Sequence, residues 1–333
     1  MTHWMPLART DPLRPEGALT LAGGWTWFDR CVALEPGRRE VVAPGDVPPD
    51  VLECLVAPRP PVAGLSMDRP RLMGILNVTP DSFSDGGRHA GAAAEGAARL
   101  VADGADILDI GGESTRPGAV PVPPEEETAR VLPVLRAGVG APVSIDTRNA
   151  STARAALEAG AAIVNDVSAL SWDPDMAGMV ARSGAPVVLM HARGTPETMQ
   201  DDPDYGDVTV EVLDALGARI AAAEAAGIAR RRILVDPGIG FGKTLAHNLQ
   251  LLRELAAFHA FGCPLVLGVS RKGTIGTVTG VRAAAERGPG SAAAALTGLA
   301  RGAQIVRVHD VALHRQAVRA WAAVEAPGLL EER

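Results

Sequence analysis

Residues 72–87 read LMGILNVTPDSFSDGG, an apolar run followed at once by a dense group of turn-forming residues. The run from Leu72 to Leu76 has the length of one buried strand. It ends at Asn77, after which Thr, Pro, Asp, Ser and Gly residues predict a long polar loop. A strand that delivers an asparagine into such a loop is typical of a binding edge on a rigid scaffold. An ordinary surface loop is the alternative, and recurrence of the pattern downstream decides against it.

Short apolar runs of this kind alternate with Ala-rich segments of helical period over the rest of the chain. The runs cover residues 72–76, 107–110, 143–145, 162–164, 187–190, 233–235, 265–269 and 305–308. Helices are predicted over 91–103, 125–138, 151–159, 173–183, 207–226, 246–258, 290–302 and 311–324. Continuous apolar strands alternating with helices indicate parallel strands covered on the outside. Eight such units predict an α/β fold, a (β/α)8 TIM barrel. A doubly wound open sheet is the runner-up, but no GxGxxG motif follows the first strand.

Residues 1–66 differ from the predicted barrel at 67–333 and form a small N-terminal extension in this interpretation. Prolines are dense there, and aromatic residues cluster near a glycine pair at 23–24 that predicts a small hairpin. A short helix is predicted over 47–55. So small a piece is marginally stable alone, and its tryptophans are therefore expected to pack on the barrel. Its role stays open, with partner binding as the alternative to a structural one.

Composition bounds the class of protein. With 47% hydrophobic and 21% charged residues, the 333-residue chain can bury a sizeable core. A net charge of −7 argues against nucleic acid or an anionic membrane as the main partner. Cys31, Cys54 and Cys263 are odd in number and share no CxxC spacing, which disfavours a zinc or disulfide framework. No secretory h-region or membrane-length apolar window is present, so a soluble cytoplasmic protein is expected.

Polar side chains follow the end of every predicted strand, where a barrel builds its active site. The acceptor groups among them are Asp109, Asp146, Asn165 and Asp236, and the donor groups suited to anions are Arg116, Lys272, Arg307 and His309. Buried and unpaired, such groups each cost about 2–7 kcal/mol, so their recurrence predicts a ligand. The acceptors suit a flat heterocycle with N–H donors, and arginine offers a fork for phosphate oxygens. A nitrogen-rich base joined to phosphate or pyrophosphate is predicted, with a metal cage as the weaker alternative.

Three further features carry competing interpretations. Residues 238–244 (GIGFGKT) resemble a phosphate loop, but Pro237 stands where that motif requires its first glycine, so the phosphate-loop interpretation fails. Lys272 could act as a Schiff-base nucleophile, yet its anion-binding neighbours favour a charged hydrogen-bond donor. His191 follows an apolar run, and two interpretations remain for it: a general base or a structural histidine.

Eight motifs stand in order along the chain: GILNVTPDSFSDGG, DIGGESTRPG, SIDTR, NDVSAL, LMHARGTPETMQ, DPGIGFGKT, VSRKGTIG and RVHDV. In order and spacing they resemble the dihydropteroate synthase family of pterin-binding TIM barrels, over roughly residues 71–324. The resemblance implies a transferase that joins 6-hydroxymethyl-7,8-dihydropterin pyrophosphate to 4-aminobenzoate, forming 7,8-dihydropteroate and pyrophosphate. The chain departs from the family pattern at Arg193 and at Ser168-Ala169, which carry no assigned role.

The resemblance also implies a role for each predicted site residue. The pterin would lie among Asp109, Asp146, Asn165, Met190 and Asp236. Lys272 would bond the pterin and close over the aminobenzoate, whose pocket, also the sulfonamide site, includes Pro117, Phe241 and Ser270. The pyrophosphate site would comprise Asn77, Arg307 and His309, with Asn77 also near Mg²⁺. Loop residues Phe83, Thr115 and Arg116 would order over the reacting centre.

The expected mechanism is a dissociative, Mg²⁺-assisted loss of pyrophosphate. Asp146 and the other acids would stabilise a cationic methylene group, while Arg307, His309, Arg116 and Mg²⁺ would stabilise the departing anion. The aminobenzoate amine would then need alignment more than base catalysis. The alternatives are a methyltetrahydrofolate methyltransferase and a catalytically silent pterin-binding paralogue. The family further implies a homodimer.

Overall fold

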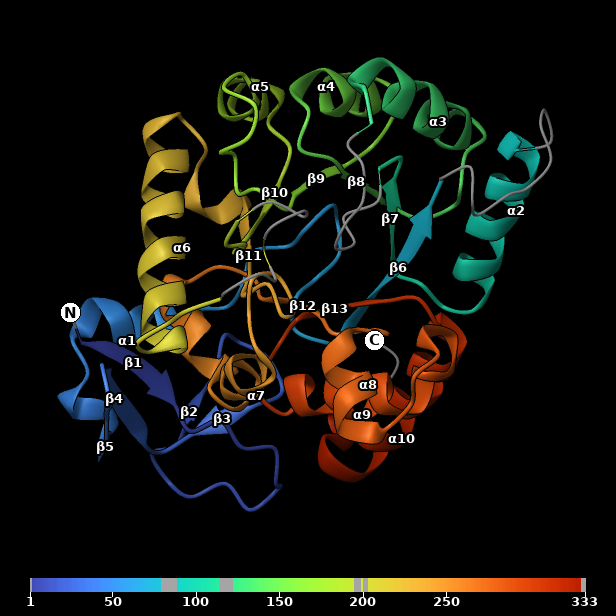
Figure 1. Ribbon diagram of the computed structural model, residues 1–333. Helices are drawn as coiled ribbons and strands as arrows, with labels where there is room; N and C mark the ends of the chain where they lie inside the picture. The colour runs from blue at the N-terminus through green and yellow to red at the C-terminus, as the bar shows by residue number, and fades with distance from the viewer. Residues whose placement is uncertain (1, 79–88, 114–121, 195–198, 200–202, 331–333) are drawn as a thin grey trace.

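The computed structural model describes residues 2–78, 89–113, 122–194, 199 and 203–330, and all structural statements refer to these. Eight parallel strands form a ring enclosed by helices (Figure 1). The strands are β6 (Arg71–Asn77), β7 (Ile107–Gly111), β8 (Val143–Asp146), β9 (Ile163–Asp166), β10 (Val187–Met190), β11 (Ile233–Asp236), β12 (Val266–Gly268) and β13 (Ile305–Val308). Their order around the sheet is β11-β10-β9-β8-β7-β6-β13-β12. A parallel bridge between Val235 and Leu265 joins the two ends, and the predicted (β/α)8 barrel is confirmed.

The strands are buried on both faces, which is why they read as unbroken apolar runs. Inside the barrel, one residue near the start of each of several strands contributes to an apolar layer: Met73, Ile107, Ile163, Val188, Leu234, Val266 and Ile305. Val62 and Met67 pack into the same layer, each about 1% exposed. The segment that leads into the barrel therefore closes its amino-terminal end, and the opposite end of the barrel is left to carry polar residues.

The surrounding helices are α2 (His89–Ala102), α3 (Pro124–Arg136), α4 (Ala150–Glu158), α5 (Met176–Ser183), α6 (Val208–Ala225), α7 (Leu245–Arg253), α8 (Gly273–Thr279), α9 (Gly288–Leu299) and α10 (Val311–Glu325). Two differ from the sequence expectation. The helix predicted over 246–258 ends at Arg253, and a 3-10 segment, η4 (Leu255–Phe261), follows. Helix α8 was not predicted, because its glycines and β-branched threonines have low helix propensity. No helix in the described ranges is long and apolar enough to span a bilayer.

The N-terminal segment forms β1 (His3–Pro6), β2 (Leu19–Thr20), β3 (Trp27–Phe28), β4 (Cys31–Glu35), β5 (Arg38–Val42) and α1 (Pro49–Val56). Strands β2 and β3 make the predicted hairpin, and α1 is the predicted helix. The antiparallel sheet β1-β4-β5 was not predicted. Trp25 donates its indole N–H to the Leu299 carbonyl at the end of α9, as expected of a tryptophan that packs on the barrel. In Figure 1 this segment lies beside α6 and α7.

The register of the sheet aligns the site residues at one rim of the barrel. Asn77 pairs with Gly111, Gly111 with Asp146, and Asp146 with Asn165, so these positions form one level row across β6 to β9. Because successive side chains of a strand alternate between faces, matched register brings like-facing positions together. The polar strand ends predicted from the sequence therefore share one mouth.

Candidate active site

Acidic and amide side chains converge at the carboxyl ends of β7, β8 and β9. Asn165 donates from Nδ2 to Asp109, at 3.2 Å from Oδ2 and 3.4 Å from Oδ1. Arg307, on β13, reaches across the barrel and donates Nε to Asp109 Oδ2 and Nη2 to Asp146 Oδ2, both at 2.6 Å. Asp109 is fully buried and Asp146 is 5% exposed. One guanidinium thus neutralises two buried carboxylates at the centre of the mouth.

The electrostatics of Asp146 are those of a site built for a further partner. Its Oδ1 atom is buried and has no hydrogen-bond partner within the described part of the chain. The pKa of Asp146 is raised to about 7, because burial, helped by the nearby Asp109 and Glu127, outweighs the opposing charge of Arg307. A buried acceptor without a partner is costly, so a donor from a ligand would relieve it.

Asp236 lies at the end of β11, beside the ammonium group of Lys272. Its Oδ1 atom accepts from the Gly238 N–H at 2.7 Å. Burial raises the pKa of Asp236, and the positive charge of Lys272 is the largest effect that opposes it. Met190, paired with Asp236 in the adjacent strand, is 5% exposed. These two residues extend the mouth toward β10 and β11.

Lys272 follows β12 and points toward the loop after β11. Its ammonium group donates to the Ile239 carbonyl and lies 4.5 Å from the centre of the Phe241 ring, a cation–π distance. Burial lowers the pKa of Lys272 to about 8, with Asp236 opposing the shift. The amine therefore remains mainly protonated at neutral pH, which favours a charged donor over a Schiff-base nucleophile.

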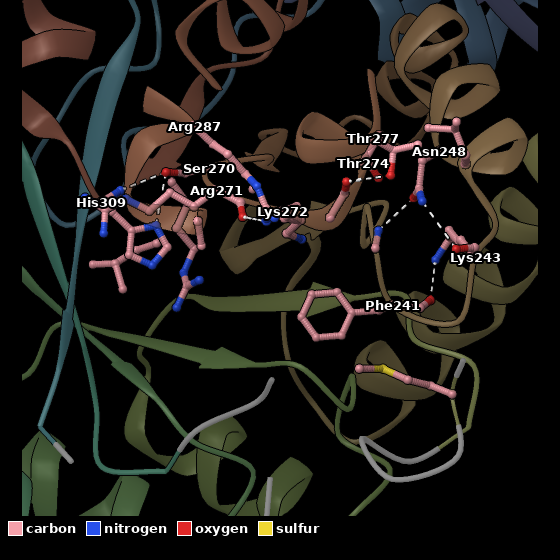
Figure 2. A pocket seen from close by; sticks show the side chains of 18 of the residues that line it. Phe241, Lys243, Asn248, Ser270, Arg271, Lys272, Thr274, Thr277, Arg287 and His309 are labelled. Carbon is pink, nitrogen blue, oxygen red and sulfur yellow. Dashed lines mark hydrogen bonds between the residues drawn. The ribbon is translucent and has the colours of Figure 1, made fainter. Parts of the chain in front are cut away.

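A cavity of about 880 Å³ opens at this end of the barrel (Figure 2). Six of the predicted site residues line it: Asn77, Phe241, Ser270, Lys272, Arg307 and His309. His309 donates its backbone N–H to Ser270 Oγ at 3.1 Å, and its Nδ1 atom lies 3.0 Å from the same oxygen. The structure thus brings the predicted anion-binding and aminobenzoate positions into one space, beside the acceptors held by Arg307.

Four predicted site residues, Phe83, Thr115, Arg116 and Pro117, lie outside the described residues. Lys243 is a charged lining residue that was not predicted as a site residue. Lys243 stands in the GFGK motif, which was weighed only as a phosphate loop and then set aside. Its ammonium group lies 2.9 Å from His191 Nδ1. Burial and the adjacent cation lower the pKa of His191 to about 3, so this ring is a neutral acceptor for a lysine.

The residues present fit a divalent cation only if a substrate supplies most of its ligands. In the described ranges, no three His, Cys, Asp or Glu side chains are grouped so as to hold a metal. Asn77, whose side chain carries one amide oxygen, lines the cavity. Mg²⁺ keeps several waters and is commonly bound through substrate phosphates with one or two protein oxygens. The described residues of the site fit a Mg²⁺ ion held mainly by substrate phosphates and water.

Comparison with known families agrees with this site. A family model described as "Pterin binding enzyme" matches residues 73–309, which include all eight barrel strands apart from the first two residues of β6. The parallel barrel with its acceptor-lined mouth is therefore that of a pterin binding enzyme.

Individual relatives narrow the assignment. Dihydropteroate synthase of Neisseria meningitidis serogroup B is 52% identical over 269 residues, covering 78% of this chain and 94% of the relative. The structure of Xanthomonas albilineans dihydropteroate synthase with 4-aminobenzoic acid is 50% identical, with a TM-score of 0.76, covering 81% of this chain and 98% of that one. The same enzyme with 7,8-dihydropteroate is 47% identical, with a TM-score of 0.73, covering 81% and 99%. The chain belongs to the dihydropteroate synthase family and is a transferase.

Proposed function

We propose that the protein condenses 6-hydroxymethyl-7,8-dihydropterin pyrophosphate with 4-aminobenzoate, giving 7,8-dihydropteroate and pyrophosphate. The observation that carries this proposal is the single mouth in which Arg307, shared between Asp109 and Asp146, borders the cavity that also holds Lys272 and Phe241. Acceptors for a pterin, cations for pyrophosphate and an aromatic wall for aminobenzoate are adjacent. The related X. albilineans enzyme has been solved with 4-aminobenzoic acid and with 7,8-dihydropteroate, which supports the same pair of ligands here.

The pterin ring would donate its amino and ring N–H groups to Asp109, Asn165 and Asp236. Binding of these donors would take over carboxylate oxygens that Arg307 now contacts. The guanidinium would then be available to the pyrophosphate, together with His309 and Asn77 on the cavity wall. Exchange of one set of charge-assisted bonds for another keeps the buried charges paired throughout.

The reaction would begin with cleavage of the bond between the exocyclic methylene carbon and the pyrophosphate oxygen, whose electron pair leaves with pyrophosphate. Asp146 would face the resulting positive charge with the oxygen that has no partner among the described residues. The amine of 4-aminobenzoate, held between Phe241 and Lys272, would form the new C–N bond and lose one proton to solvent. Mg²⁺, held by Asn77 and substrate oxygens, would supply neutralisation of the pyrophosphate charge.

The experiment is to incubate the protein with the pterin pyrophosphate and Mg²⁺ and to follow pyrophosphate release with and without 4-aminobenzoate. Release that depends on aminobenzoate and is lost in Lys272→Ala supports the proposal. Tight pterin binding without release would indicate a silent paralogue and reject it. Omission of Mg²⁺ and the Asn77→Ala variant test the metal assignment separately. The homodimer stays a prediction, which light scattering of the purified protein would check.

A further inference from the structure

Lysine is nearly absent from this chain. Of its 32 lysine and arginine residues, 30 are arginine, and the only lysines are Lys243 and Lys272. Both line the same cavity (Figure 2). An ammonium group is a compact tetrahedral donor of three hydrogen bonds, whereas guanidinium is a planar fork. The distribution indicates that these two positions need the compact donor, and Lys243 has no role in the reaction described above.

The ammonium group of Lys243 is buried and bonded on all sides, and the residue is 3% exposed. It lies 2.9 Å from His191 Nδ1, 2.9 Å from the Gly238 carbonyl oxygen and 3.0 Å from the Phe241 carbonyl oxygen. A longer contact of 3.4 Å to the His191 carbonyl oxygen completes the set. Burial lowers the pKa of Lys243 to about 7, and the hydrogen bonds to these acceptors favour its protonated form. Lys243 therefore joins Gly238 and Phe241 of the preceding loop to His191, the residue that follows β10.

His191 is suited to the acceptor role in this cluster. Burial is the largest cause that lowers its pKa, and Lys243 lowers it further, so the ring is neutral at physiological pH. Because Nδ1 faces the ammonium group, the ring proton belongs on Nε2. This arrangement leaves His191 without the Nδ1 lone pair that a general base would use.

The loop 238–242 lies directly against the backbone of residues 191–193. Gly238 has φ +68°, and a Cβ atom added there would lie 1.8 Å from the His191 carbonyl oxygen. Gly242 has φ +64°, and its added Cβ would lie 2.4 Å from the Arg193 carbonyl oxygen. Only glycine fits such close approaches with positive φ. The loop is thus packed against the segment that follows β10, and Lys243 adds hydrogen bonds to the same contact.

This loop carries the groups that locate Lys272. The Ile239 carbonyl accepts from the Lys272 ammonium group, and the Phe241 ring lies 4.5 Å from the same nitrogen. Lys243 donates a hydrogen bond to the backbone carbonyl of Phe241, the residue that carries this ring. A shift of the loop would therefore displace both Phe241 and Lys272, which form one wall of the cavity.

We propose that Lys243 is a positioning residue that, with His191 as its acceptor, fixes the loop 238–242 and so sets the wall against which 4-aminobenzoate binds. The inference rests on the proposed synthase activity and deepens it. Lys243 acts through Phe241 and Lys272, and it reaches the pterin acceptor Asp236 only through Gly238, which bonds both residues. Its loss therefore weakens the use of aminobenzoate more than that of the pterin.

The first test is Lys243→Met, which keeps an unbranched side chain, one atom shorter, and removes the nitrogen with all its donors. The KM for 4-aminobenzoate should rise roughly tenfold, the equivalent of about 1.4 kcal/mol. The KM for the pterin pyrophosphate should rise by a smaller factor, because Gly238 also donates to Asp236. The matched control is Arg231→Met, the same loss of a cation at an exposed position outside the site, which should leave both constants unchanged. Equal changes in both KM values, or no change in either, would overturn the proposal.

A pair of His191 variants tests the same link if Lys243→Met fails to fold. His191→Asn keeps a side-chain acceptor and should retain the KM for aminobenzoate within about threefold. His191→Leu removes the acceptor and should raise that KM as Lys243→Met does. Equal behaviour of the two variants would contradict the assigned role.

Because the chain has only two lysines, labelling of the lysine ε-carbon gives one NMR signal for each. Addition of 7,8-dihydropteroate should shift the Lys272 signal of the unmodified protein. In Lys243→Met the remaining signal should start at a different position and respond less. An unchanged Lys272 signal would reject the positioning role. A lack of aminobenzoate-dependent release by the unmodified protein would instead reject the proposed function itself.

Discussion

Arg307 and Arg39 each bridge two buried carboxylates, but they differ in position and in effect. Arg307 joins Asp109 and Asp146 at the barrel mouth through two short bonds. Arg39, on β5 of the N-terminal segment, joins Asp207 and Glu254 of the barrel through four bonds of 2.8–3.0 Å. Asp207 is the N-cap of α6, and Glu254 follows the last residue of α7. The second network therefore fastens the extension to two barrel helices.

The pKa of Asp146 is shifted in the direction opposite to the pKa values of Asp207 and Glu254. Burial alone would raise the pKa of Asp207 and of Glu254, but hydrogen bonds from Arg39 and from other donors outweigh it, and both are lowered. At the mouth burial prevails over Arg307, and the pKa of Asp146 is raised to about 7. A network that satisfies its own charges stabilises the fold, whereas one that leaves an acceptor unsatisfied is prepared for a ligand.

Removal of Arg307 should have the largest effect on activity. In Arg307→Ala the carboxylates lose their counter-charge and the departing pyrophosphate loses a donor, so kcat/KM should fall by about 10³-fold, as for other deleted electrostatic donors. Circular dichroism should show a folded protein, because the buried acids can take up protons. Pyrophosphate release measures the effect, and unchanged turnover would show that Arg307 does not serve the pyrophosphate.

Removal of Arg39 should affect stability instead. Arg39→Ala leaves Asp207 and Glu254 partly buried without their shared cation, at a cost of about 2–3 kcal/mol. Arg39 is itself 26% exposed, which keeps the loss below that of a fully buried pair. Chemical denaturation measures it, and kcat/KM at 20 °C should change less than about twofold.

Arg38→Ala is the matched control for Arg39→Ala. Arg38 neighbours Arg39 and pairs with glutamates of its own hairpin, but its side chain is 65% exposed. Exposed ion pairs contribute about 0–1 kcal/mol, so this variant should be close to the unmodified protein in stability. Equal losses in the two variants would show that Arg39 contributes no more than a surface charge.

The Asp146→Asn variant should separate stability from activity within the mouth. A carboxyl group whose folded pKa is raised costs stability once the pH exceeds its unfolded value near 4, and the neutral amide carries no such cost. At pH 8 the unliganded variant should therefore be more stable by about 2 kcal/mol, after the weaker contact with Arg307 offsets part of the gain. This difference should shrink as the pH falls to 5, while activity at pH 8 is strongly reduced. A less stable variant at pH 8 would mean that Asp146 contributes to the fold.

The sequence was sufficient for the barrel and for most of the mouth, because both follow from local patterns. Unbroken apolar runs indicate buried parallel strands, and the residues that end them, such as Asp109 and Asp236, share a rim by topology alone. The Arg39 network could not be predicted, since its partners lie 168 and 215 residues away. Lys243 was missed for a different reason. Its sequence motif resembles a phosphate loop. The structure shows instead that the Lys243 ammonium group donates to the carbonyl oxygens of Gly238 and Phe241.

The pH dependence of stability is the smallest expected effect, and it separates the two networks most directly. Asp207 and Glu254 have folded pKa values below their unfolded values near 4, so their contribution is present above that pH and is lost as the pH falls through the folded values. The stability difference between the unmodified protein and Arg39→Ala should therefore be constant from pH 7 to pH 5 and decrease by about 1 kcal/mol toward pH 3. Asp146→Asn should differ from the unmodified protein most at high pH. Parallel pH profiles for the two variants would mean that both arginine networks stabilise the fold in the same way. That result would contradict the assignment of the Arg307 network to ligand binding.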